Sequence, residues 1–94
     1  VSTDDTETTL NGELKVYPNP MDNQGQIVFK LEHDQHAEVN LLSIEGQHVR
    51  QLFNNRSGNE NVVLDIQKDN LAPGLYLIQL KTREGQMTER MIVL

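Results

Sequence analysis

The alternation of apolar and polar residues with a period of two constrains this chain more than any other feature of its sequence. Ile27, Phe29 and Leu31, for example, are separated by Val28 and Lys30. Because successive side chains of a strand point to opposite faces, this pattern indicates a strand with one mainly apolar face. Similar segments occur at residues 15–17, 37–44, 49–53, 62–66, 75–80 and 87–94. Only two alanines occur and no N-cap signal precedes a 3.6-residue repeat, so helix has little support.

Turn-forming residues separate these segments, at residues 32–35, 45–47, 54–59, 70–74 and 83–86. Gly46 fits a tight hairpin turn whose geometry needs a positive φ. Pro18 and Pro20 lack a backbone N–H, so they must end or bend the first strand. Segment 75–80 is apolar on both faces at its start, which predicts a central strand, and Leu71 is expected to be buried within its turn.

Seven short antiparallel strands within residues 14–94 predict an all-β fold, a seven-stranded antiparallel β-sandwich of immunoglobulin-like architecture. The sequence has no Cys and no Trp, so the Cys and Trp pin of antibody domains is missing. Leu, Ile, Val and Phe together make 27 of the 94 residues. This share lies above the roughly 20% below which chains tend to be disordered. The sequence therefore predicts one domain with a thin core.

The first thirteen residues differ in composition from the rest. Four Thr, one Ser and three acidic residues follow Val1 within residues 1–9. Such a segment cannot bury enough apolar surface to offset the entropy of ordering it. We therefore expect residues 1–13 to form a flexible linker to an upstream domain, and the folded domain to occupy residues 14–94. Because Val1 is not an initiator methionine, we expect the chain to be a fragment of a longer protein.

The charge balance excludes several classes of partner. Eight basic and 14 acidic residues give a formal net charge of −6. Such a chain repels phosphate backbones and anionic lipid, so nucleic acid and direct membrane insertion are not expected. The absence of Cys excludes disulfides, Cys-ligated zinc and thiol catalysis. No apolar run approaches the roughly 18 residues of a membrane span, and the N-terminus lacks the pattern of a signal peptide.

The candidates for catalytic or metal chemistry are weak. His33 and His36 are three residues apart, a spacing that suits a shared metal on a helix but not in a turn between strands. His48 stands in a predicted strand without a nucleophile placed beside it. Asp4 and Asp5 lie in the linker, where no fixed separation is held. Aspartates at turns or strand ends usually form Asx turns, although calcium remains an alternative; they are Asp22, Asp34, Asp65 and Asp69. We therefore expect no enzyme and no cofactor.

Several segments match a known family in order. They are Tyr17-Pro18-Asn19-Pro20, residues 27–31, the end of a strand at residues 44–49, Leu64-Asp65-Ile66, residues 71–77 and residues 89–94. This set resembles the C-terminal sorting domain of the type IX secretion system of Bacteroidetes, over about residues 14–94. The chain departs from the family pattern at Leu94, where a final lysine is frequent, and at Glu89-Arg90, where a lysine pair is common.

The resemblance implies that the domain is a targeting signal and not a catalyst. Family members direct large secreted proteins from the periplasm across the outer membrane, so the implied location is secreted or at the cell surface. The implied partners are the translocon with its shuttle proteins, a sortase-like signal peptidase and the upstream cargo domain. The peptidase would cut near residues 9–13 and join the cargo to a cell-surface anchor.

The matching positions receive different roles. Pro18, Asn19, Pro20, Gly46, Gly74 and Tyr76 are expected to be mainly structural, with the ring of Tyr76 buried and its hydroxyl bonded to a backbone group. Direct recognition is expected in the last strand, at Arg90, Met91, Ile92, Val93 and Leu94. An edge strand offers unpaired backbone groups to which a receptor can add a strand.

Two other functions remain open. The first is an accessory module that binds carbohydrate or an extracellular surface beside a catalytic domain. All four aromatic residues fall in strand-like positions where burial is expected, and this weighs against sugar stacking. The second is a structural spacer, which would tolerate any place in the parent chain.

Overall fold

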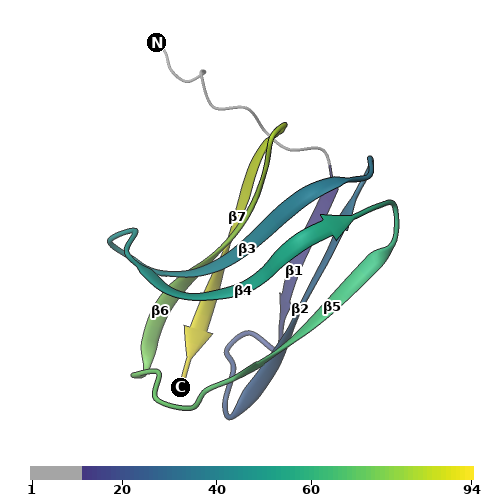
Figure 1. Cartoon of the computed structure of the whole chain (residues 1–94). Coiled ribbons are helices and arrows are strands. Elements are labelled where there is room, and N and C mark those ends of the chain that lie inside the picture. The colour runs from purple at the N-terminus through teal and green to yellow at the C-terminus, as the bar shows by residue number, and fades with distance from the viewer. Residues whose placement is uncertain (1–11) are drawn as a thin grey trace.

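The computed structural model describes residues 12–94, which form seven strands and a two-layer sandwich (Figure 1). The strands are β1 (Gly12–Tyr17), β2 (Gln24–Leu31), β3 (Gln35–Ser43), β4 (His48–Ser57), β5 (Asn61–Gln67), β6 (Gly74–Thr82) and β7 (Gly85–Val93). The linker expected over residues 1–13 lies outside the described residues up to residue 11. Gly12 and Glu13 belong to β1.

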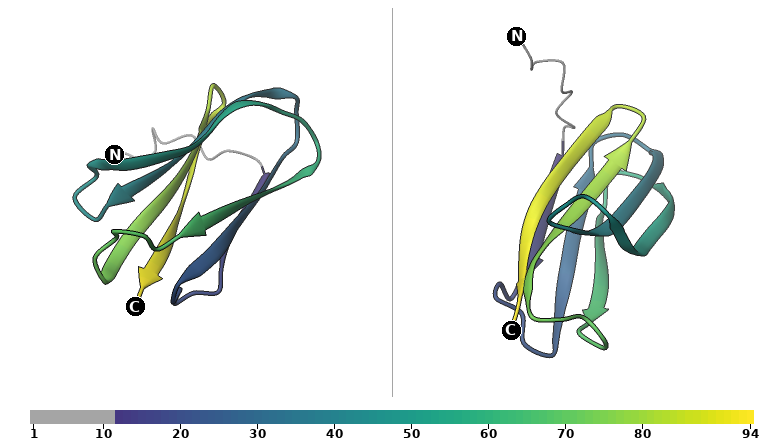
Figure 2. Two further views of the ribbon diagram at one scale, coloured as in Figure 1. Left: turned by 60° about the horizontal axis from the view of Figure 1, so that its bottom comes forward. Right: turned by 90° about the vertical axis from the view of Figure 1, so that its left-hand side faces the viewer.

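The strands form two antiparallel sheets with the orders β1-β2-β5 and β4-β3-β6-β7. Figure 2 shows these two sheets as facing layers, with β7 and β1 at neighbouring edges. This arrangement confirms the predicted seven-stranded β-sandwich, and its topology is consistent with an immunoglobulin-like fold. β6 lies between β3 and β7, so the prediction of a central strand is also confirmed.

The core consists of alternate residues from the inner faces of both sheets. Phe29 of β2 is fully buried and meets the ring of Phe53 of β4 edge to face, with ring centroids 5.2 Å apart. The other fully enclosed side chains come mainly from β2, β3, β6 and β7: Ile27, Leu31, Ala37, Val39, Leu41, Ile78, Leu80 and Met91. Full burial of each large apolar side chain contributes roughly 1.5–3 kcal/mol, so this period-two pattern supplies the main driving force for folding.

The loop predicted at residues 54–59 is wrong for its first four residues, 54–57. Asn54, Asn55 and Arg56 belong to β4 and pair with β3 as far as Ser57, which is buried. β4 is an edge strand of its sheet, and polar side chains on an edge face solvent and discourage aggregation. The polar residues at the end of β4 therefore look like a loop in the sequence, but they belong to an edge strand that is protected from aggregation.

Two further details match the sequence. Leu71 is buried in the connection between β5 and β6, as expected. β1 ends at Tyr17, directly before Pro18. No helix in residues 12–94 is long and apolar enough to cross a membrane.

Candidate functional site

The segment that follows β1 lies along the outer edge of β7. Asn19 Nδ2 donates a hydrogen bond of 2.9 Å to the backbone oxygen of Arg90, and the Ile92 N–H donates one of 3.0 Å to Asn19 Oδ1. Two residues on, the Met21 N–H donates to Ile92 O at 2.7 Å, and the Leu94 N–H donates to Met21 O at 2.9 Å. Met21 and Val93 thus form an isolated parallel bridge. We call this arrangement of residues 18–21 on β7 the clasp.

The clasp explains why an asparagine stands between two prolines. Pro18 and Pro20 have no N–H to offer a neighbouring strand. The side-chain amide of Asn19 carries one acceptor and one donor group, as a peptide unit does, and it bonds β7 in place of the backbone. Met21 then fixes the segment, because its side chain is fully enclosed in the core.

The clasp changes the expectation for the last strand. The sequence predicts unpaired backbone groups at an open edge over residues 90–94. This prediction is wrong for Arg90 O, Ile92 N, Ile92 O and Leu94 N, which are all bonded to Asn19 or Met21. In the sequence, the sign of the clasp is an asparagine flanked by two prolines. Its partner Arg90 lies 71 residues later, and no local pattern reveals a pairing over that distance.

The side chains of β7 alternate between the two faces of its sheet. Met91 and Val93 are buried in the core, whereas Ile92 and Leu94 are 41% and 56% exposed. Arg90 is also exposed. The two segments expected to carry the sorting motif, residues 18–20 and 90–94, therefore form one continuous edge of the sheet. The exposed side chains of residues 90–94 lie on its outer face.

Tyr76 and Gly74 stand at the start of β6, close to the end of the same sheet edge. The Tyr76 hydroxyl donates a 2.7 Å hydrogen bond to Ala72 O, which confirms the backbone contact expected from the sequence. The ring is half-buried against the core. A tyrosine at this corner, bonded a few residues upstream, is a hallmark of immunoglobulin-like sandwiches. Gly74 opposes Val93 on β7 and has a φ of 149°.

Gly46 lies in the turn that joins β3 to β4. Its φ of 90° confirms the positive value expected for a tight turn. The turn closes through hydrogen bonds from the Gly46 N–H to Ser43 O and from the Ser43 N–H to Gln47 O, both 2.9 Å. The hydrogen bond of Gly46 lies within the β3–β4 turn, so Gly46 supports the fold and is not part of the clasp.

The histidines considered as metal ligands have other partners. His33 Nδ1 lies 3.2 Å from Glu84 Oε2 in an exposed pair, and His36 Nε2 contacts Asn54 Oδ1. Within residues 12–94, no three His, Asp or Glu side chains gather in a group that would hold a metal ion.

Three of the four aspartates considered for calcium, all except Asp22, are engaged with other side chains. Asp34 lies 3.4 Å from Arg56 Nε, and Asp69 lies 3.9 Å from Arg50. Asp65 Oδ1 accepts a 3.3 Å hydrogen bond from Gln26 Nε2. These contacts tie each carboxylate to a different part of the surface, so the arrangement favours structural roles for them.

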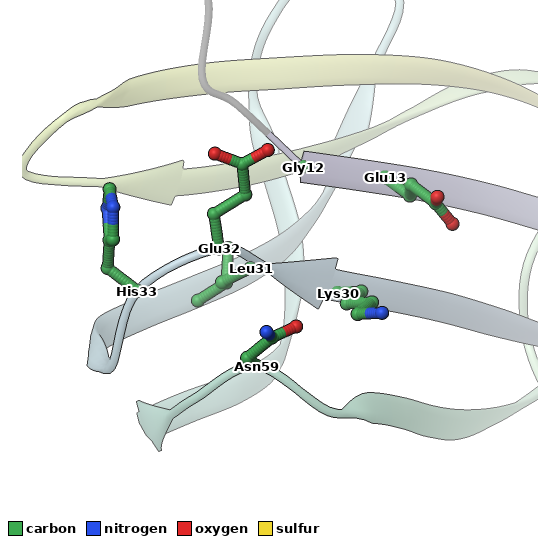
Figure 3. Close-up of a pocket in the computed structure, with 7 residues that line it drawn as sticks. All are labelled: Gly12, Glu13, Lys30, Leu31, Glu32, His33 and Asn59. Carbon is green, nitrogen blue, oxygen red and sulfur yellow. The ribbon is translucent and has the colours of Figure 1, made fainter.

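A surface depression of about 480 Å³ lies where β1 begins (Figure 3). Glu13, Lys30, Glu32 and His33 contribute its charged or titratable side chains. In Figure 3 the side chains of Glu13 and Lys30 extend away from those of Glu32 and His33. Catalysis needs acid and base groups that converge on a common reacting atom, and this geometry does not provide them.

The aromatic residues differ in exposure. Phe29 is fully buried, and Phe53 and Tyr76 are half-buried against the core. Tyr17, however, is 45% exposed at the end of β1. The expectation that all four aromatics are buried is therefore wrong for Tyr17. Because it directly follows the buried Val16, the alternation of β1 places it on the outer face of the three-stranded sheet.

Comparison with known protein families matches this chain to a family of secretion signals. The sequence model of the family described as "Secretion system C-terminal sorting domain" matches residues 15–94, which include every strand except the first three residues of β1. No curated protein matches the chain at a significant level.

Proposed function

Because the chain belongs to the family of C-terminal sorting domains of the type IX secretion system, we propose that it directs its cargo across the outer membrane through recognition of its last strand. Membership makes the domain a type IX sorting signal that interacts with the secretion machinery and leads to the cell surface or the medium. The family is one of sorting signals and not of catalysts.

The clasp is the observation that carries the proposal of recognition at β7. A strand at the edge of a sheet is prone to fray. Here Asn19 and Met21 hold residues 90–94 by four hydrogen bonds, so the outward side chains keep a fixed arrangement. A receptor that reads a preorganised surface loses less entropy on binding. This supports residues 90–94 as the segment read, and Pro18, Asn19, Pro20, Gly74 and Tyr76 as its support.

Removal of the domain after export forms the second part of the proposal. The sortase-like peptidase would cut before Gly12, and the cargo would receive its surface anchor there. β1 begins at the end of the sandwich opposite to the C-terminus of the chain (Figure 1). This separation supports the proposal, because the machinery can hold the β7 end while the peptidase reaches the linker.

A fusion experiment tests the proposed function. The 94-residue chain is joined behind a periplasmic reporter and produced in a Bacteroidetes host with an intact type IX system. We expect the reporter outside the cell, and inside the periplasm when the host lacks the translocon. Retention of the reporter in the competent host would refute the proposal.

Binding of carbohydrate is a second candidate, because Tyr17 is exposed. Its strand partner is Gln26, which in turn pairs with Asp65, so an aromatic ring and two polar side chains lie in one row across the sheet. Sugar sites commonly combine a stacking ring with planar hydrogen-bonding groups. Binding of the isolated chain to a glycan array, with loss in Tyr17→Ala, would support this candidate; absence of binding would exclude it for the glycans tested.

A further inference from the structure

The outer face of the four-stranded sheet has an apolar half next to the clasp. Leu75 of β6 is the direct cross-strand partner of Ile92 of β7, and both are 41% exposed. In the next row of this face, the half-buried Leu77 of β6 opposes Leu42 of β3, which is buried and forms the floor of the face. Leu94 continues the same face beyond Ile92 and is 56% exposed. We call these five residues the outer apolar face; none of them belongs to the core cluster between the sheets.

The other half of this sheet face is polar and satisfied by its own contacts. Gln51 Nε2 donates to Asn40 Oδ1, Asn40 Nδ2 donates to Gln79 Oε1, and Gln79 Nε2 donates to Gln86 Oε1, at 3.3 to 3.4 Å. This chain of amides crosses β4, β3, β6 and β7 in that order. Since these side chains use their polar groups on one another, the apolar half is the part of the face that gains from a partner.

The clasp determines how a partner meets β7. To add a strand at residues 90–94, a receptor must displace the four hydrogen bonds of Asn19 and Met21 and withdraw the buried Met21 side chain from the core. Docking on the outer apolar face requires none of these changes. At residues 90–94 the folded domain is therefore open to contact through side chains and closed to backbone pairing.

The charges beside the apolar face indicate the kind of partner. Leu77 and Leu42 are flanked in their row by Arg90 on β7 and His48 on β4. The exposed Arg90 side chain borders Leu77, and the Lys68 ammonium group donates a hydrogen bond to Leu94 O, so this apolar face has basic side chains at its border. An apolar surface bordered by carboxylates complements this arrangement.

Resting on the proposed function, we propose that a protein of the type IX machinery docks on the outer apolar face of the folded domain. That protein presents an apolar surface with an acidic border for Arg90. Leu75 and Ile92 form the centre of the contact and Leu94 extends it. The backbone edge of β7 stays closed by the clasp during this contact.

Glutamate substitutions in the reporter fusion test the docking surface. Leu75→Glu and Ile92→Glu each place a charge in the apolar contact and are expected to lower the exported fraction by about tenfold or more. Ile92→Leu, which keeps an apolar side chain, is expected to preserve export. Val63→Glu is the matched control, since Val63 is 54% exposed on the outer face of the other sheet. It is expected to stay within about twofold of the native fusion, a difference well below 1.4 kcal/mol.

The result separates this inference from the function itself. Thermal unfolding of each variant must first show that the domain is folded. If Ile92→Glu destabilises β7, the test relies on Leu75→Glu alone. Export of the native fusion together with equal export of a folded Leu75→Glu or Ile92→Glu variant would overturn the docking surface alone. If the Asn19→Ala fusion is exported more than the native fusion, and the folded Leu75→Glu fusion is fully exported, docking on the outer apolar face is refuted in favour of strand addition to β7. A native fusion that stays in the periplasm would instead overturn the proposed function.

Discussion

Substitution of Asn19 by alanine measures what the clasp contributes to the last strand. Asn19→Ala removes the 2.9 Å bond to Arg90 O and the 3.0 Å bond from the Ile92 N–H. A hydrogen bond contributes about 0.5–1.5 kcal/mol net, and water can reach these exposed groups in the variant. We therefore expect the free energy of unfolding to fall by about 1–2 kcal/mol. For a domain of this size each kcal/mol lowers Tm by about 4–8 °C.

Two measurements check this value and locate the effect. Urea unfolding followed by circular dichroism gives the global loss, and amide hydrogen exchange gives the local one. The Ile92 amide loses its acceptor in the variant, so it should exchange about 5–30 times faster than in the native chain. Asn61→Ala, at an exposed amide that begins β5, is the control and should change neither quantity substantially. Unchanged stability and unchanged exchange at Ile92 would refute the role assigned to Asn19.

The scaffold gives three further predictions. Gly46→Ala should cost about 1–2 kcal/mol in urea unfolding because φ is 90°, and no atom within 4 Å of the added Cβ gives a steric cause; a neutral result would contradict the turn geometry. Tyr76→Phe removes the 2.7 Å hydrogen bond to Ala72 O and should lower the free energy of unfolding by about 0.5–1.5 kcal/mol. A more stable variant would contradict a stabilising role for this hydrogen bond. Met21→Ala should cost about 2–5 kcal/mol, since Met21 is fully buried, and a loss below about 1 kcal/mol would show that the clasp is not held by the core.

The strands are predictable because their signal is local. Alternation at Ile27, Phe29 and Leu31 follows from burial of one face, and the core residues on β2 match it. The burial of Leu71 and the backbone contact of the Tyr76 hydroxyl are predictable for a similar reason. An isolated leucine within a polar turn gains most by packing inward, and a phenol beside a core needs a partner for its hydroxyl.

The features that the sequence does not reveal have physical reasons that differ from one another. Asn54 and Arg56 resemble a loop because an exposed edge strand has the same polar composition. The burial of Met21 is hidden because a lone apolar residue after two prolines belongs to no period. The clasp depends on a hydrogen bond between Asn19 and Arg90, and the pairing of such distant residues emerges only from the topology.

Crosslinking in living cells tests most directly whether other proteins read the domain through its β7 face. A photoreactive amino acid is placed at Leu75 or at Val63 in the exported fusion, and the adducts are identified in a host with the type IX system. We expect an adduct with a component of that system from position 75 and none from position 63. Adducts from position 63 alone, or none from position 75 while the fusion is still exported, would contradict it.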